Sequence, residues 1–399
     1  MSALLSAAYG DDRSGAAASG RPERLYVADL KLTNFRNYAR AHVRLDDRPV
    51  LLVGENGAGK TNLLEAVSLL GAGQGLRGRP YGDLVRKDAT GGFAIAARVM
   101  SRHGEVEIGT GSAPQEAGEG TGRIVRISGK EQSAGTLADY VSVIWLIPAM
   151  DGLFTGPGSE RRRFLDRLVL AIDPKMRGPL GRYDRAMRQR NRLFQMREGS
   201  RALFTGLETE MAEAAVAIAA SRLDAVARLA ALIESTRRAR GDSPFPWAVI
   251  SVEGMLENAL AMQSATEVED AYRALLDAGR ERDRAASRTL EGPHLSDFIV
   301  SHGPKETPAP LCSSGEQKGL LIGLVLAKAE LIKALQGVPP LILLDEIAAH
   351  LDSARRKALF GEILRLDTQA WMTGTDVALF APIDQDAQIL TVNQGIIRS

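Results

Sequence analysis

Residues 54–61 read Gly54-Glu55-Asn56-Gly57-Ala58-Gly59-Lys60-Thr61. This spacing is typical of a loop that wraps around a phosphate chain, because its glycines let the backbone bend and bring N–H groups close to phosphate oxygens. Lys60 is placed to reach the β- and γ-phosphates, and the Thr61 hydroxyl to bind Mg²⁺. We include the next residue, Asn62, in the expected site. The stretch therefore predicts binding of a nucleoside triphosphate together with Mg²⁺.

The residues on both sides of the loop fit this interpretation. The aliphatic run 49–53 predicts a buried strand that ends at Gly54, and residues 62–70 have apolar side chains at helical spacing. The phosphates would then face the N-terminus of a helix, which carries a partial positive charge. These flanks disfavour the alternative, a glycine-rich turn that only mimics the motif.

Two adjacent carboxylates follow a second aliphatic run. Residues 339–344 predict a buried strand, and Asp345 and Glu346 come directly after it, at the edge where ligands bind in open α/β sheets. We expect Asp345 to hold Mg²⁺ through water. We expect Glu346 to polarise the attacking water, so that Lys60 and Glu346 are the candidate catalytic residues. The alternative for the two acids is a solvated strand end.

A polar segment precedes the apolar stretch 319–327. It reads Cys312-Ser313-Ser314-Gly315-Glu316-Gln317-Lys318. A serine and free backbone N–H groups at the start of a helix can bind an anion. Taken alone, the segment is more typical of an ordinary helix cap followed by an acid.

Together these segments resemble the ABC-type ATPases, and among them the DNA-repair branch more than the transporters. The resemblance implies that ATP is the nucleotide and that two composite sites form only in an ATP-bound dimer. It also implies that Ser313, Gly315 and Glu316 act on the nucleotide of the other subunit. By the same resemblance, the segment 349–352, which ends at Asp352, would occupy the place of the loop that crosses the dimer interface.

The chain is more narrowly similar to the RecF family. Residues 32–38 read Leu-Thr-Asn-Phe-Arg-Asn-Tyr, like the opening signature of that family, and 162–166 and 292–294 resemble its two internal signatures. There are also gaps. After the third signature only one charge is kept, at Asp297, and no Q-loop glutamine is found near 145–148. Thr373-Gly374-Thr375-Asp376 stands where transporters carry a switch histidine, which fits RecF but leaves the γ-phosphate sensor unidentified. These gaps suggest slow hydrolysis or a γ-phosphate sensor supplied differently.

Length and composition set the broad class. A chain of 399 residues with a net charge of +1 and 45% hydrophobic residues is an ordinary globular protein, long enough for two domains. No apolar stretch is long enough to span a membrane, and the N-terminus lacks the features of a secretory signal. The single cysteine, Cys312, allows a reducing compartment, and the five histidines lack zinc-ligand spacing. We expect a cytoplasmic protein whose only metal is the Mg²⁺ of the nucleotide.

The middle of the chain has a different pattern. Met211, Ile218, Ala225 and Leu232 recur at heptad spacing, with Leu229 on the same stripe, and a second helical pattern runs from Val268 to about Leu290. Gly241 to Pro246 separates the two, because proline cannot continue a helix. We expect an α/β fold: a discontinuous ATPase head over 25–150 and 291–399, a helical lobe inserted over 151–290, and a disordered tail over 1–24. The short seam excludes the very long coils of SMC-type proteins.

The inserted lobe is rich in arginine, which pairs well with phosphates and could hold a DNA backbone without reading sequence. The alternative is that these arginines form solvated helix faces paired with acids. The clusters comprise Arg161, Arg162, Arg163 and Arg167; Arg185, Arg188, Arg190, Arg192 and Arg197; and Arg237, Arg238 and Arg240.

The resemblance implies a repair ATPase that dimerises head to head with ATP, clamps duplex DNA near single-strand gaps, and releases it after weak, DNA-stimulated hydrolysis. It also implies RecO and RecR as partners and help in loading RecA. Two alternatives stay open: the nucleotide-binding subunit of a transporter, and a structural clamp of the SMC type.

Overall fold

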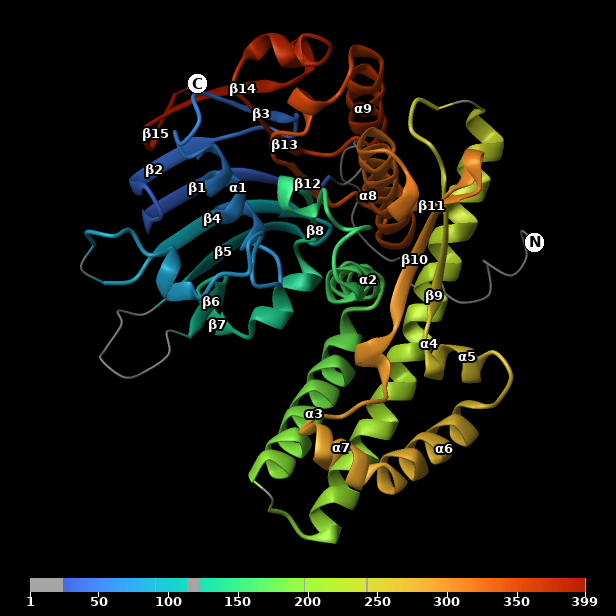
Figure 1. Cartoon of the computed structure of the whole chain (residues 1–399). Coiled ribbons are helices and arrows are strands. Elements are labelled where there is room, and N and C mark those ends of the chain that lie inside the picture. The colour runs from blue at the N-terminus through green and yellow to red at the C-terminus, as the bar shows by residue number, and fades with distance from the viewer. Residues whose placement is uncertain (1–23, 90, 113–121, 197, 242, 399) are drawn as a thin grey trace, which may run out of the picture.

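The computed structural model of the chain describes residues 24–89, 91–112, 122–196, 198–241 and 243–398. Within these ranges the strands form three sheets, and the two larger sheets make up the head of the molecule (Figure 1). The expected tail over 1–24 lies outside the described residues except for Arg24, which forms ion pairs with Asp47 and Asp367.

One large sheet is parallel apart from one edge. Its order is β15-β14-β3-β13-β12-β8, and only β15 runs antiparallel to its neighbour. The strands expected over 49–53 and 339–344 are β3 and β12, and every residue of both is buried. The strands are β3 (Val50–Val53), β8 (Val143–Leu146), β12 (Leu341–Leu344), β13 (Ala370–Gly374), β14 (Gln388–Asn393) and β15 (Ile396–Arg398).

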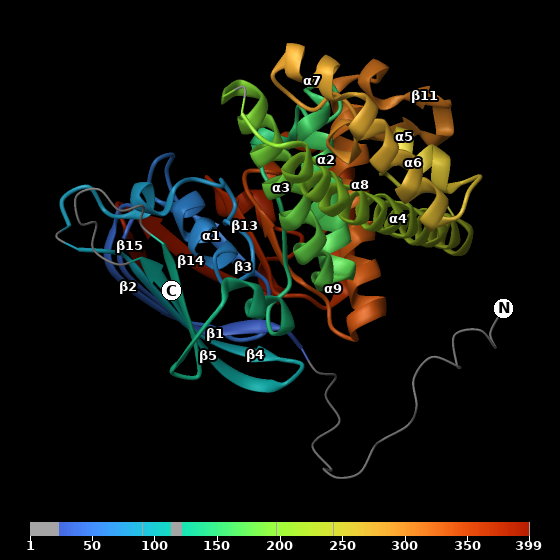
Figure 2. The same ribbon diagram turned by 90° about the horizontal axis from the view of Figure 1, so that it is seen from below.

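The second large sheet is antiparallel, with the order β2-β1-β4-β5-β6-β7. Helix α1 (Lys60–Ser68) lies between the two sheets (Figures 1 and 2), and Leu63, Leu64 and Val67 are fully buried there. The strands of this sheet are β1 (Tyr26–Phe35), β2 (Tyr38–Arg44), β4 (Ala94–Ser101), β5 (Gly104–Ser112), β6 (Arg123–Ile127) and β7 (Lys130–Gln132).

The inserted segment is built around one long helix. α4 has 40 residues, which at 1.5 Å per residue makes it roughly 60 Å long. Of the expected heptad stripe, Met211, Ile218, Ala225 and Leu229 are buried. The helix ends where Gly241 adopts a φ of 66°. The helices of this segment are α2 (Gly158–Ile172), α3 (Arg177–Met196), α4 (Arg201–Arg240), α5 (Met255–Leu260), α6 (Ala265–Ala278) and α7 (Arg280–Ala286).

The sequence analysis did not foresee a strand within the helical insert. β9 (Ala248–Glu253) alternates buried and exposed residues and pairs with β10 (Asp297–His302), which in turn pairs with β11 (Thr307–Pro308). This third sheet joins chain from both sides of residue 290. The helix expected over 268–290 is also interrupted at Gly279, between α6 and α7. The division of the chain into 25–150, 151–290 and 291–399 therefore stays a proposal.

Two helices connect the insert back to the parallel sheet. α8 (Ser314–Gln336) is buried along much of its length and contacts β8, α2 and α4. α9 (Ser353–Leu366) follows β12 and packs beside α8 (Figure 1). The starts of both helices lie close to each other, because Arg355 of α9 donates to the backbone oxygen of Gly315 at 3.3 Å.

Candidate nucleotide-binding site

Strand order brings together two segments that are far apart in the sequence. β3 pairs in parallel with β13, and β13 pairs in parallel with β12, so the C-terminal ends of these strands share one edge of the sheet. The loop 54–61 follows β3, and Asp345 and Glu346 follow β12. Segments almost 300 residues apart thus meet at the edge where parallel sheets bind ligands.

The loop adopts a conformation that requires glycine. Gly59 precedes α1 with a φ of 118°, and a Cβ atom there would lie 2.5 Å from Nδ2 of Asn37 and 2.9 Å from the Tyr38 hydroxyl. Gly57 has a φ of 82°. Because α1 begins at Lys60, the free N–H groups of its first turn open toward the loop and suit an anion.

Lys60 is folded over the loop. Its side chain is only 5% exposed, and Nζ donates to the backbone oxygens of Gly54 at 2.6 Å and of Glu55 at 2.8 Å. Burial lowers the pKa of Lys60, and the nearby carboxylates of Glu346 and Asp345 oppose that shift. The ammonium group is therefore held at the loop, where a phosphate oxygen would be a better partner than a backbone carbonyl.

A hydrogen-bonded chain links the loop to the carboxylates. The Thr61 hydroxyl donates to both oxygens of Asp345, at 2.9 and 3.0 Å, and the Thr373 hydroxyl donates to Asp345 Oδ1 at 2.9 Å. Thr373 Oγ1 also accepts from the backbone N–H of Glu346 at 2.8 Å. Thr61 and Asp345 are oxygen donors of the kind that Mg²⁺ prefers. Thr373 was noted in the sequence only as part of a segment without a switch histidine.

Glu346 has an unusual backbone. Its φ is 55°, in the left-handed region that residues with a Cβ atom rarely adopt. Such a conformation costs roughly 1–3 kcal/mol and persists only where the surroundings hold it. The bond to Thr373 provides such support, and the half-buried Glu346 side chain begins directly after the strand end.

The opening signature has a role that the sequence did not reveal. Asn37 donates to the backbone oxygen of Ala58 at 3.1 Å and accepts from Asn62 at 2.8 Å. The buried Tyr38 hydroxyl donates to the backbone oxygen of Gly59 at 2.9 Å. Asn37, between β1 and β2, and Tyr38, the first residue of β2, therefore support the phosphate loop through these bonds. The motif at 32–38 could be recognised in the sequence. The spacing of its residues, however, does not indicate that Asn37 and Tyr38 contact the phosphate loop.

The segment 313–316 forms the start of α8. Ser313 and Glu316 make a capping box: Ser313 Oγ accepts from the Glu316 N–H at 3.4 Å, and Glu316 Oε2 accepts from the Ser313 N–H at 2.9 Å. The segment therefore forms the helix cap that its sequence predicts, and Ser313 is exposed at the same time. Among the described residues, no hydrogen bond or ion pair joins this segment to the loop 54–61. Asp352 similarly caps α9 by accepting from the Arg355 N–H at 2.8 Å.

Comparison with known proteins assigns the chain to a family. The model of the RecF/RecN/SMC N terminal domain matches residues 26–398. The DNA replication and repair proteins RecF of Mesorhizobium japonicum and Brucella suis are 52% and 51% identical to the chain, over 94% of its length and 98% and 96% of theirs. The chain belongs to the RecF family.

Solved structures agree with this membership at the level of fold. RecF-ATPrS and RecF-ATP structures of a recombination mediator protein align with TM-scores of 0.80 and 0.78 at 21% identity, over 94% of this chain and 98% and 99% of theirs. A Pyrococcus furiosus Smc head domain aligns with a TM-score of 0.51 at 16% identity, over 94% of this chain and 95% of its own. The expected α/β fold with an ABC-type ATPase head is confirmed. No helix among the described residues is long and apolar enough to cross a membrane.

Arg222 hydrogen-bonds to both segments that resemble the internal RecF signatures, 162–166 and 292–294. Arg222 of α4 bonds both oxygens of Asp166, at 2.9 and 3.1 Å, and donates to the Pro293 backbone oxygen at 2.6 Å. The charge retained at Asp297 pairs with Arg161 at 2.7 Å.

Several arginines considered for DNA binding have internal partners. Arg190 is fully buried against Glu208 and Asp283, so it is excluded as a DNA contact. Arg237 and Arg238 share Glu234. Arg197 lies outside the described residues.

Proposed function

We propose that this protein is an ATP-dependent DNA-binding repair ATPase of the RecF type. The connected chain from Thr61 through Asp345 and Thr373 to Glu346 carries the proposal, because it places a metal-binding carboxylate and a candidate base beside a phosphate loop. The relatives that are 52% and 51% identical in sequence to this chain are DNA replication and repair proteins.

Each residue of the site has a proposed task. The backbone of 54–59 and the start of α1, with Asn62, hold the ATP phosphates, and Lys60 moves from its backbone partners to the β- and γ-phosphates. Thr61 and Asp345 would hold Mg²⁺, which supplies positive charge against the phosphates. Glu346 orients and polarises the attacking water, giving ADP and phosphate. Hydrolysis is slow, and DNA stimulates it.

The second half of the site comes from another copy of the chain. Ser313, Gly315, Glu316 and Asp352 would reach the nucleotide bound by the partner, so ATP drives a head-to-head dimer. Ser313 and Gly315 are exposed and have no bond to the loop 54–61 of their own chain, which supports action in trans. The Ser313 Oγ bond within the capping box is long, at 3.4 Å, so little is lost when the hydroxyl changes partner.

The relatives support a proposal for the biological setting. We propose that the dimer clamps double-stranded DNA next to single-strand gaps without reading sequence, and that it helps RecO and RecR to load RecA. The relation to a recombination mediator protein of the RecFOR pathway supports this setting. A cytoplasmic location is part of this proposal.

The decisive experiment follows mass in solution and binding to gapped duplex DNA, with and without ATP-Mg²⁺. We expect ATP to double the mass and to increase DNA affinity. Lys60→Ala should abolish both effects, because the phosphates lose their cation. Glu346→Gln should bind ATP but stall in a persistent dimer on DNA. A Lys60→Ala protein that still dimerises with ATP, or normal turnover in Glu346→Gln, would contradict the assignment.

The fold likeness to the Smc head keeps a structural clamp as the second candidate. Such a clamp would bind ATP and dimerise without measurable turnover. A transporter subunit would show no ATP-dependent DNA affinity. The same experiment, extended to phosphate release, separates all three.

A further inference from the structure

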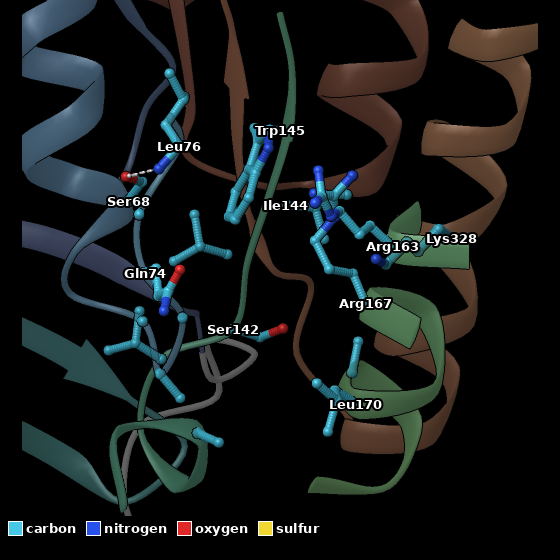
Figure 3. Close-up of a pocket in the computed structure, with 18 of the residues that line it drawn as sticks. Ser68, Gln74, Leu76, Ser142, Ile144, Trp145, Arg163, Arg167, Leu170 and Lys328 are labelled. Atoms are coloured by element: carbon cyan, nitrogen blue, oxygen red, sulfur yellow. Dashed lines mark hydrogen bonds between the residues drawn. The ribbon is translucent and has the colours of Figure 1, made fainter. Parts of the chain in front are cut away.

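A cavity of about 540 Å³ lies apart from the phosphate loop, between the segment that follows α1, the strand β8, and the helices α2 and α8. Figure 3 shows Arg163, Arg167 and Lys328 gathered on one side of it, with Trp145 beside them and Gln74 and Leu76 on the other side. No residue of the loop 54–61 lines the cavity. Its volume is within the ~300–1,000 Å³ typical of small-ligand pockets.

The charged groups that line the cavity are all cations. No aspartate or glutamate occurs among its described lining residues. Asp166, which precedes Arg167 on α2, is already bound through both oxygens by Arg222. The cavity thus lacks the carboxylates that would neutralise Arg163, Arg167 and Lys328 from within the chain.

Lys328 is the most unusual of these cations. It is only 6% exposed, and within the described ranges its ammonium group has neither a hydrogen bond nor an ion pair. The Lys328 Nζ atom lies over the Phe164 ring, 5.8 Å from the ring centroid. A buried charge without a partner is unfavourable, and proteins normally pair it. Burial and the adjacent Arg167 lower the pKa of Lys328 to about 7.

Arg167 is in a similar position. Burial lowers its pKa, Arg163 one turn earlier on α2 lowers it further, and Asp166 opposes part of the shift. Its guanidinium lies 5.4 Å from the centre of the Trp145 ring. Two guanidinium groups and one ammonium group therefore converge beside an aromatic ring, and no carboxylate occurs among the described lining residues.

We propose that this cavity is a second anion site that binds the phosphate group of a nucleotide. A phosphate offers several acceptor oxygens, which suit two guanidinium groups and one ammonium group at once. Trp145 offers an aromatic surface on which a base can stack, and Leu170 adds apolar lining nearby. The ligand is a free mononucleotide or the phosphorylated end of a nucleic-acid strand.

The test uses the full chain with Lys60→Ala, so that the phosphate loop no longer competes for anions. Sodium pyrophosphate without Mg²⁺ is titrated at fixed ionic strength by calorimetry. We expect saturable one-site binding. Adding Lys328→Met should weaken it at least tenfold, and adding Arg163→Gln, at an exposed position, should weaken it severalfold. Lys357→Met, which removes the same charge from the exposed face of α9, should leave binding unchanged.

Stability without ligand separates a binding role from a structural one. If Lys328 serves the ligand, Lys328→Met should melt at the same or a higher temperature than its parent in anion-free buffer, because an unpaired buried charge is removed. A lower melting temperature together with unchanged pyrophosphate affinity would overturn the proposal. So would the absence of saturable binding in the Lys60→Ala protein.

The source of the phosphate is found by competition. Adenosine monophosphate, a short oligonucleotide with a 5′-phosphate, and the same oligonucleotide with a 5′-hydroxyl are each added to the pyrophosphate complex. Displacement by the 5′-phosphorylated strand at lower concentration than by its 5′-hydroxyl counterpart indicates a strand end. Displacement by the mononucleotide alone indicates a free nucleotide. If none of the three displaces pyrophosphate, the nucleotide assignment is wrong.

Discussion

At the scale of single residues, one buried hydroxyl organises the candidate catalytic edge. Thr373 is only 1% exposed and serves two partners, accepting from the Glu346 N–H and donating to Asp345. It fixes the left-handed turn at Glu346 and aligns the carboxylate that meets Thr61. The orientation of both acids therefore depends on a residue of the neighbouring strand.

Thr373→Val keeps the shape of the side chain and removes both bonds. We expect the loss to lower the free energy of unfolding by about 1–3 kcal/mol, because a buried N–H is left without an acceptor. We expect kcat for ATP hydrolysis to fall at least tenfold, with a smaller change in ATP affinity. Steady-state kinetics and denaturant unfolding measure the two effects. Thr391→Val, at an exposed position of β14, is the control; equal losses in both variants would contradict this role.

At the scale of elements, the start of α8 carries a charge-dependent cap. The Glu316 carboxylate accepts a hydrogen bond from Lys305, and it also bonds Ser313. The bond from Lys305, and then those with Ser313, lower the pKa of Glu316 to about 2 from an ordinary value of 4.5. Because the folded-state pKa is depressed, the stabilisation is present above about pH 4.5 and is lost as pH falls toward 2. The site is exposed, so salt should weaken it.

Glu316→Gln retains the capping geometry without the charge. At low salt and pH 7 we expect the variant to melt at a lower temperature than the parent, and the difference to vanish as pH approaches 2. Thermal melts between pH 2 and 7 test this, with Glu306→Gln as the exposed control nearby. A temperature difference that persists at pH 2 would show that the carboxylate charge is not responsible.

A second element-scale feature is the buried junction of α3, α4 and α7. Arg190 is fully buried and bonds Glu208 at 3.0 Å and Asp283 at 2.6 Å. Arg190→Met should lower the free energy of unfolding by about 3–5 kcal/mol, because the buried Asp283 loses its close partner and the buried Glu208 keeps only Arg280. Denaturant unfolding measures it. Arg188→Met, at a 67% exposed position on the same helix, should cost about 1 kcal/mol or less. Similar losses in both variants would refute the distinction.

At the scale of the whole molecule, the proposed DNA binding would have to come from local clusters of cations, since the net charge is only +1. Contacts to the DNA backbone release counterions, so affinity falls steeply with salt. We expect the ATP-bound protein to lose affinity for duplex DNA at least tenfold between about 50 and 200 mM salt. Two duplexes of equal length and different sequence should bind equally. Salt-independent or sequence-selective binding, measured by fluorescence anisotropy, would contradict backbone recognition.

The sequence by itself determined the local parts of this protein. The loop 54–61, its strand and helix, the acids at 345–346 and the cap at Ser313 follow from residue order, because glycine conformation, periodicity and capping act over a few neighbours. The β9 strand did not show in the sequence, since its pairing with β10 joins segments separated by an intervening helical region.

Only the tertiary structure decided which distant residues share a site. Parallel pairing of β3, β13 and β12 brings Thr61, Thr373 and Asp345 within hydrogen-bonding distance, and the β1–β2 connection supports the loop through Asn37 and Tyr38. The burial of Arg190 and the unpaired state of Lys328 likewise depend on neighbours far away in the chain. The sequence determines the charge and the functional group of each side chain. Packing between distant segments determines its hydrogen-bond and ion-pair partners and how deeply it is buried.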